Sequence, residues 1–195
     1  MKTKGFGEHR RIADLVGRLG RTAHCLQFTD GLNPAQWEAL RYLARANRYS
    51  LSPSALAEFL GTTKGTASQT VRALENKGLV RRAPNGRDRR SVTLELTEAG
   101  AALLRRDPMA GFERASRSLP GDRLAAVVDG LSRLLRDVQD GCGGRPFGVC
   151  QECGHFRPLA AADEPKGPHR CGLVGDPLSE SDSALICVSF APVTR

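Results

Sequence analysis

The feature that most limits the fold of this 195-residue chain is a change of composition near residue 141. The last 55 residues contain 8 glycines and 6 prolines and show no helical period. Such a segment buries too little apolar surface to fold by itself, so it needs a metal or disulfide staple. We expect a Gly-rich linker at 141–149 and a small, irregular, metal-stapled module at 150–195. Four of the six cysteines lie in that module: Cys150, Cys153, Cys171 and Cys187.

The spacing of these four cysteines is typical of metal ligands. Cys150 and Cys153 form a CxxC pair, and Cys171 and Cys187 follow after 17 and 15 intervening residues. Thiolates are soft ligands, which both zinc and iron–sulfur clusters select. A zinc ribbon usually supplies a second close pair, whereas one CxxC pair followed by two separated cysteines resembles high-potential iron–sulfur proteins. The pattern therefore favours a [4Fe–4S] cluster, with Zn²⁺ as the alternative.

Other states of this segment stay open. His155 and His169 lie two residues from Cys153 and Cys171, so either could replace a cysteine at zinc or donate a hydrogen bond to a ligand. The cysteines could also be free thiols on a disordered tail, or Cys150 and Cys153 could form a regulatory disulfide. A metal centre here would couple the rest of the chain to metal, oxygen or redox state.

The first 140 residues have the apolar periodicity of helices. A stripe of apolar residues at spacings of three and four predicts a helix at about 8–28. Asn33-Pro34 and Ser52-Pro53 each supply a capping residue followed by proline, which predicts helices that start at Pro34 and Pro53. Thr62-Thr63 can cap a fourth helix, which Gly78 ends.

The third and fourth helices, joined by a tight turn at Gly61, are typical of a helix-turn-helix. The periodicity of the fourth helix places one set of side chains inside: Ala67, Thr70, Val71 and Leu74. Another set points outward: Thr66, Ser68, Gln69 and Arg72. Their hydroxyl, amide and guanidinium groups suit phosphates and base edges, so we expect them to contact DNA.

A β-hairpin is expected next, with strands at 79–82 and 91–96. The second strand alternates, and its inward side chains are expected to be Val92, Leu94 and Leu96. Pro84-Asn85-Gly86 supplies the turn chemistry. The loop carries three cations, Arg87, Arg89 and Arg90, so its tip would form a wing that reaches a DNA backbone or minor groove.

Two further helices are expected to close this part of the chain. One begins at Thr97-Glu98, is bent at Pro108 and reaches Ser116. The other follows the break at Leu119-Pro120-Gly121. Its wide apolar face consists of Leu124, Val127, Val128, Leu131, Leu134, Leu135 and Val138. Because a winged domain offers little core to cover this face and the first helix, both are expected to form a dimer surface.

Residues 74–97 resemble the MarR family of winged-helix regulators. Leu74-Glu75-Asn76-Lys77-Gly78-Leu79-Val80-Arg81-Arg82 is similar to the exit of that family's recognition helix. Asp88-Arg89-Arg90-Ser91 matches its D-x-R-S wing motif, and Leu96-Thr97 matches the dipeptide that opens its next helix. Helix order and loop lengths extend the resemblance over residues 8–140.

The resemblance implies a homodimer that binds a pseudo-palindromic duplex and usually represses transcription. It implies that the recognition helix enters the major groove, that Asp88 orients the wing and that Arg90 contacts DNA. Arg87 and Arg89 would add attraction to phosphate that does not depend on base sequence. Members of the family often respond to a small-molecule effector, which is a further expected partner.

Charge and composition agree with this interpretation. Residues 1–140 carry 24 Lys or Arg against 15 Asp or Glu, whereas 141–195 carry 5 against 6, so a polyanion would bind the first part. Because the sequence has no apolar segment long enough to span a membrane, we expect a cytoplasmic protein. Because no catalytic arrangement of residues stands out, we expect that it is not an enzyme. The expected fold class is mainly α with a β-hairpin wing, a winged helix-turn-helix with terminal dimerisation helices. An electron-transfer protein is the alternative class.

Overall fold

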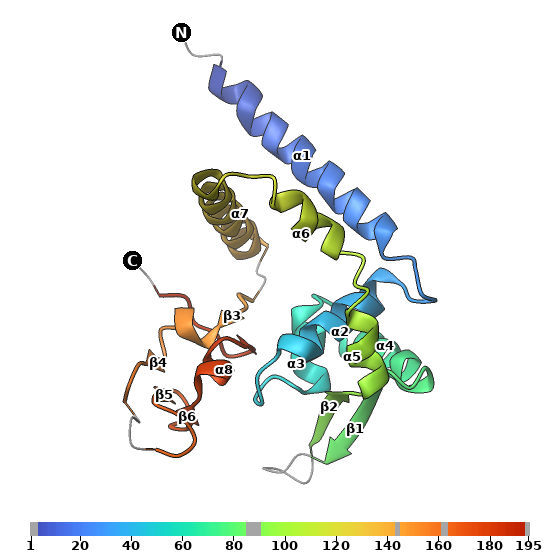
Figure 1. Cartoon of the computed structure of the whole chain (residues 1–195), viewed down its shortest axis with the longest axis vertical. Coiled ribbons are helices and arrows are strands. Elements are labelled where there is room, and N and C mark those ends of the chain that lie inside the picture. The colour runs from blue at the N-terminus through green and yellow to red at the C-terminus, as the bar shows by residue number, and fades with distance from the viewer. Residues whose placement is uncertain (1–3, 85–90, 143–144, 161–163, 194–195) are drawn as a thin grey trace.

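The computed structural model describes residues 4–84, 91–142, 145–160 and 164–193 (Figure 1). It is mainly helical with small antiparallel sheets, which confirms the expected winged helix-turn-helix fold class. Among the described residues, no helix combines the length and apolar character that crossing a membrane requires.

Three helices build the helix-turn-helix, and each begins at the cap that the sequence predicts. In α2 (Pro34–Arg45), α3 (Pro53–Phe59) and α4 (Lys64–Asn76), the side chains of Asn33, Ser52 and Thr63 accept a hydrogen bond from the third helical amide. These caps satisfy amides that a helix start leaves unpaired. The helices pack around fully buried side chains, which include Trp37, Leu40, Leu56, Val71 and Leu74.

Strands β1 (Val80–Pro84) and β2 (Val92–Leu96) form the expected antiparallel hairpin. Val80 pairs with Leu96, and Pro84 pairs with Val92. Leu94 is fully buried and Leu96 half-buried, but the inward position expected for Val92 is wrong, because its side chain is 37% exposed. Val92 pairs with Pro84 at the far end of the hairpin. The wing-tip residues 85–90 lie outside the described part of the chain.

The bend expected at Pro108 is a complete break between two helices, α5 (Glu98–Leu104) and α6 (Ala110–Ser116). Proline has no amide hydrogen and disfavours the helical conformation in the residue before it. That residue, Asp107, instead accepts a hydrogen bond from the Met109 amide at 2.8 Å and another from Arg41 at 2.9 Å. The side chain of Asp107 therefore stabilises the turn.

Gly100 in α5 lies against the backbone of Leu79, and a Cβ atom added there would stand 2.2 Å from the Leu79 carbonyl oxygen. We expect Gly100→Ala to lower the free energy of unfolding by roughly 1–3 kcal/mol, because the helix must move away from β1. Urea unfolding followed by circular dichroism measures this loss. Gly121→Ala is the control, since a Cβ there meets nothing within 4 Å. Equal losses in both variants would contradict the steric explanation.

Two long helices, α1 (Lys4–Leu26) and α7 (Gly121–Gly141), lie apart from the helix-turn-helix (Figure 1). Their apolar side chains are exposed in the single chain, from 37% at Leu124 to 57% at Leu135. On α1 these residues are Ile12, Leu15, Val16, Leu19 and Leu26, and on α7 they are Leu124, Val127, Val128, Leu131, Leu135 and Val138. We call the two faces together the α1/α7 surface.

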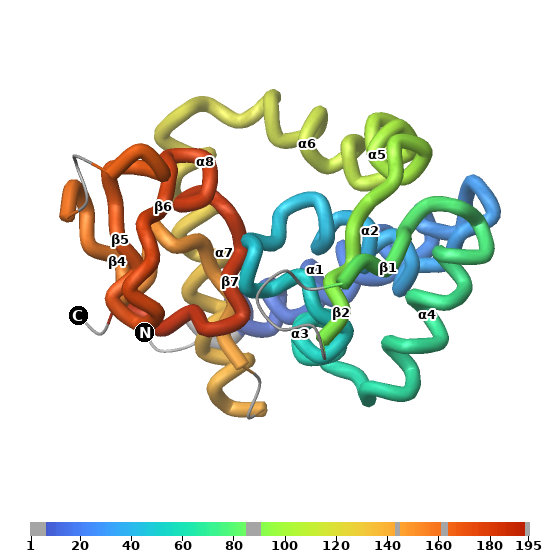
Figure 2. The backbone as a smooth tube through the Cα atoms, turned by 90° about the horizontal axis from the view of Figure 1, so that it is seen from below, coloured from blue at the N-terminus to red at the C-terminus, as the bar shows by residue number. Residues whose placement is uncertain are grey.

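The C-terminal segment is held by short elements. Strand β3 (Gly148–Val149) pairs with β7 (Ile186–Cys187), and β4 (Phe156–Arg157), β5 (His169–Cys171) and β6 (Pro177–Leu178) form a second sheet. A 3-10 turn, η1 (Cys150–Glu152), and the single-turn helix α8 (Glu180–Ser183) complete it. Figure 2 shows β7 beside the helix-turn-helix.

This segment is not a free appendage. Ile186 is buried in the same apolar cluster as Trp37, and Phe147 and Val188 pack against that cluster. The Phe147 ring lies 5.3 Å from that of Phe59 on α3, edge to face. The C-terminal segment therefore completes the core of the winged domain.

Candidate DNA-binding surface and four-cysteine pocket

Helix α4 presents a polar face to solvent. Of its candidate side chains, Thr66, Gln69 and Arg72 are exposed and Ser68 is half-buried. The inner side chains Ala67, Val71 and Leu74 are buried, as the periodicity predicts. Lys64, in the first turn of α4, is also exposed and adds a positive charge that the sequence analysis did not single out.

Three basic residues around α4 are paired within the winged domain. Arg81 forms an ion pair with Glu95 at 2.7 Å, Arg82 with Glu75 at 3.3 Å, and Lys77 donates to the Gly31 carbonyl at 2.7 Å. These cations are therefore engaged within the winged domain. The wing residues Arg87, Asp88, Arg89 and Arg90 lie outside the described residues.

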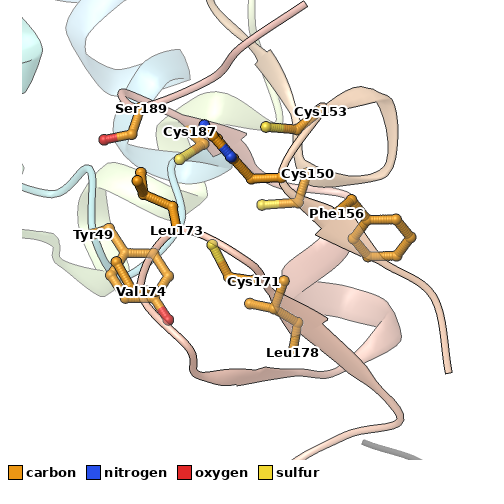
Figure 3. Close-up of a pocket in the computed structure, with 11 residues that line it drawn as sticks. Tyr49, Cys150, Cys153, Phe156, Cys171, Leu173, Val174, Leu178, Cys187 and Ser189 are labelled. Carbon is orange, nitrogen blue, oxygen red and sulfur yellow. The ribbon is translucent and has the colours of Figure 1, made fainter. Parts of the chain in front are cut away.

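The four cysteines of the C-terminal segment line one pocket, which we call the four-cysteine pocket. Cys150 begins η1, Cys153 caps its end, Cys171 ends β5 and Cys187 ends β7. Figure 3 shows their sulfur atoms pointing toward a common space. Cys171 is half-buried, and the other three are buried. Segments that are far apart in the sequence thus bring four thiols together.

The four thiols border a cavity of ≈ 30 Å³. Within the described residues, no group of three or more His, Cys, Asp or Glu side chains is arranged to hold one metal ion. The four thiols share a pocket but do not surround one point closely.

The pocket walls are mainly apolar and aromatic. They include Tyr49, Phe156, Leu173, Val174 and Leu178 (Figure 3).

The two candidate histidines are placed differently. His155 lines the pocket. His169 does not, because its Nδ1 accepts from the Leu159 amide at 3.2 Å and its Nε2 lies 2.9 Å from Glu180. His169 therefore has no nitrogen left to bind a metal in this conformation.

Hydrogen bonds reach the sulfur atoms from outside the pocket. Asn47 Nδ2 donates to Cys150 Sγ at 3.5 Å, and the Ala191 amide donates to Cys153 Sγ at 3.4 Å. The hydrogen bond from the Cys150 thiol, with further bonds to Asn47 and Ser50, lowers the pKa of Cys187 to about 6 against opposing burial. The same bond and burial raise the pKa of Cys150. The hydrogen bond between the two thiols therefore favours the deprotonated form of Cys187.

The connection between α2 and α3 makes several hydrogen bonds with this segment. The Asn47 amide donates to the Ile186 carbonyl at 2.8 Å, and the Val188 amide donates to Ser50 Oγ at 2.8 Å. Arg48 reaches Asp182 at 3.3 Å and the Pro177 carbonyl at 2.7 Å. These contacts could not be predicted from the sequence, because polar residues in a connection between helices show no pattern that indicates a distant partner.

Comparison with known proteins assigns the winged helix-turn-helix to a class. The model of the MarR family matches residues 30–91. The transcriptional repressor NicR of Pseudomonas putida is 32% identical over 144 residues, which cover 68% of this chain and 89% of NicR. The chain therefore belongs to the MarR family. The Escherichia coli repressor MprA is 35% identical over 75 residues, 38% of this chain but only 43% of MprA.

Solved structures agree in fold. A MarR regulator from Methanosarcina mazei has a TM-score of 0.55 and 22% identity, and the match covers 67% of this chain and 98% of that one. Streptococcus pneumoniae FabT, solved in complex with DNA, has a TM-score of 0.54 and 22% identity over 68% of this chain. The rest of this chain has no counterpart in these two structures.

Proposed function

We propose that this protein is a DNA-binding transcriptional regulator, most simply a repressor, which acts as a homodimer on a pseudo-palindromic duplex. The carrying observation is the exposed face of α4, where Gln69 and Arg72 stand beside Thr66 on a helix anchored by a buried core. Amide and guanidinium groups can each make two hydrogen bonds to a base edge in the major groove. The relatives MprA and NicR are named as repressors, and FabT was solved with DNA, which supports the same activity here.

A duplex-binding titration at several salt concentrations tests this function. A duplex selected from a random pool by the protein should bind specifically, with an affinity that falls steeply as salt rises, because cations on the protein release counterions from phosphate. Failure to select any duplex, in either the oxidised or the reduced protein, would overturn the proposal.

The α1/α7 surface supports the homodimer. Apolar faces of this extent on two long helices are costly to leave in water, and a second copy can cover them in a two-fold symmetric interface. The duplex would then be read by two copies of α4, one on each half of the site.

We expect Leu131→Glu to raise the dimer dissociation constant by about 100-fold, because each copy would bury an unpaired carboxylate at the interface. Leu131 is 49% exposed in the single chain. Analytical ultracentrifugation measures the dissociation constant. Arg133→Ala on the same helix is the control, since Arg133 pairs only with its neighbour Asp129 in the described chain and its side chain is 66% exposed. A dimer that is unchanged by the glutamate would place the interface elsewhere.

The four-cysteine pocket is proposed to bind a metal centre through Cys150, Cys153, Cys171 and Cys187. The convergence of four thiols inside apolar walls supports this role, since cysteine sulfur is the ligand that soft metals select. A metal centre that changes with oxidation would let the regulator sense redox state, oxygen or iron.

A [4Fe–4S] cluster suits the pocket better than Zn²⁺. The four sulfur ligands of zinc lie about 2.3 Å from one point, whereas no group of three or more His, Cys, Asp or Glu side chains in the described residues is arranged to hold one ion. A cluster with an iron atom at each of four corners accepts more widely separated cysteines. Anaerobic purification followed by metal and sulfide analysis decides between them. Iron with an equal amount of sulfide supports the cluster. Stoichiometric zinc in a colourless protein contradicts the proposal that the metal centre senses redox state.

A second candidate keeps the regulator but makes the metal a structural zinc and the signal a small molecule. It is favoured by an open groove of ≈ 520 Å³, lined by Leu79, Ala99, Ala102, Leu103, Arg105 and Arg106. Arg106 is paired with Asp30 at 3.2 Å, but Arg105 beside apolar side chains suits a ligand with an acidic group and an apolar body. Loss of operator binding on adding an aromatic acid such as salicylate, with the zinc retained, would support this candidate.

A further inference from the structure

Two polar side chains are buried in the connection between α2 and α3, at the contact with the four-cysteine pocket. Asn47 is 1% exposed and Ser50 is 0% exposed. Asn47 Nδ2 donates to Cys150 Sγ at 3.5 Å, and Asn47 Oδ1 accepts from Ser50 Oγ at 2.7 Å and from the Tyr49 amide at 3.1 Å. Both polar atoms of the Asn47 side chain are therefore used, and one of them binds a sulfur atom of the pocket.

The hydrogen bonds continue from Ser50 into the winged domain. Tyr42 on α2 donates its hydroxyl to the Ser50 carbonyl at 2.7 Å, and the Tyr42 ring packs on Phe59 of α3 at 4.5 Å. The carbonyl of Leu51 accepts from the Leu94 amide of β2 at 2.7 Å. A short connection thus joins a pocket cysteine to α2, to α3 and to the wing.

The pocket also holds this connection through the residues on both sides of Cys187. Ile186 accepts from the Asn47 amide, and Val188 donates to Ser50 Oγ, both at 2.8 Å. A group that binds Cys150 and Cys187 would therefore fix the hydrogen bonds that Cys150, Ile186 and Val188 make with residues 47–50. Buried hydrogen bonds transmit such a constraint well, because leaving a donor or acceptor unpaired there is costly.

We propose that Asn47 couples occupancy of the four-cysteine pocket to DNA binding. Loading the pocket orders Cys150 and Cys187, which holds residues 47–50 and with them the position of α3 and α4. The loaded protein then binds its duplex more tightly than the empty protein. This inference rests on the proposed function, and it adds the residue through which the metal centre acts. By thermodynamic linkage, bound DNA raises the affinity of the pocket for the metal centre by the same factor by which the metal centre raises the affinity for DNA.

The test compares loaded and empty protein on one duplex, selected by the loaded protein from a random pool. The full chain is loaded with ferrous iron and sulfide under anaerobic conditions, and in parallel with Zn²⁺ alone, and the empty protein is made with a chelator. For the wild type we expect affinity about 5–150-fold higher when loaded, the usual range of coupling between two sites. In Asn47→Ala this ratio should fall toward one while metal content is retained.

Two further variants separate coupling from folding. Tyr42→Phe removes only the hydroxyl that binds the Ser50 carbonyl, so it should lower the ratio even if Asn47→Ala folds poorly. Arg48→Ala is the matched control. It removes the exposed contacts of the same connection with Asp182, Asp176, the Pro177 carbonyl and the Tyr49 hydroxyl, but none of the buried hydrogen bonds of Asn47 and Ser50, and it should leave the ratio unchanged.

The outcomes separate the two proposals. A wild-type ratio of one or below, or an unchanged ratio in both Asn47→Ala and Tyr42→Phe, overturns the coupling while metal binding and DNA binding stand. Absence of any selected duplex overturns the proposed function, and the coupling with it. Hydrogen exchange gives a second readout: loading should slow exchange in α3 and α4 of the wild type but not of Asn47→Ala.

Discussion

Replacing Gln69 and Arg72 together by alanine is expected to weaken binding to each half of the selected duplex by roughly 2–6 kcal/mol. Each side chain that binds a base edge contributes about 1–3 kcal/mol of discrimination. A homodimer places two copies of α4 on the site, so each loss occurs twice. Fluorescence anisotropy with the selected duplex and with a shuffled duplex measures the effect. The loss should be concentrated on the selected sequence, and the two affinities should approach each other.

The control for this variant is Arg117→Ala, which removes one exposed positive charge at the end of α6. It should change affinity little and equally for both duplexes. A Gln69→Ala/Arg72→Ala variant that keeps its preference for the selected duplex would show that α4 does not read the bases. The exposed polar face of α4 would then need another function.

Replacing Cys171 by serine is expected to lower the metal bound per chain by more than about tenfold, since a hydroxyl is a far weaker ligand for a soft metal. Cys171 suits this test because it is half-buried, so the change disturbs the core less than a change at Cys150. Metal analysis of anaerobically purified protein measures the loss. The thermal unfolding midpoint should fall as well, because metal binding stabilises the folded segment.

Cys142→Ser is the matched control. Cys142 is exposed at the end of α7 and does not line the four-cysteine pocket. Its replacement should leave metal content unchanged. Equal loss in both variants would point to general oxidation or unfolding, and retention of metal in Cys171→Ser would remove Cys171 from the ligand set.

Local chemistry allowed much of the winged domain to be predicted. Capping by Asn33, Ser52 and Thr63 depends on neighbouring residues only, so each helix start could be read directly. At Pro108 the sequence indicated only a bend, whereas the structure has two separate helices. Val92 was assigned wrongly because strand alternation gives the side of a hairpin but not where the covering helices stop.

The four-cysteine pocket could be predicted only in part. The CxxC spacing identifies the thiols, but not their distance from one another or the walls around them. The contact between Asn47 and Cys150 spans 103 residues of sequence, and the usual reading of Asn47 is a polar residue in an exposed connection. A buried long-range hydrogen bond depends on the whole fold, so no local pattern reports it.

The insertion of Ile186 into the core of the winged domain has a consequence for synthesis of the chain. Its partners Trp37 and Leu40 leave the ribosome about 150 residues earlier, which at 5–20 residues per second is roughly 7–30 s. During that interval the apolar surface that Ile186 later covers faces water. The core of the nascent helix-turn-helix therefore stays incomplete until the segment that carries Cys187 is made. A chain whose translation stops before that segment would have a DNA-binding domain with an incomplete core.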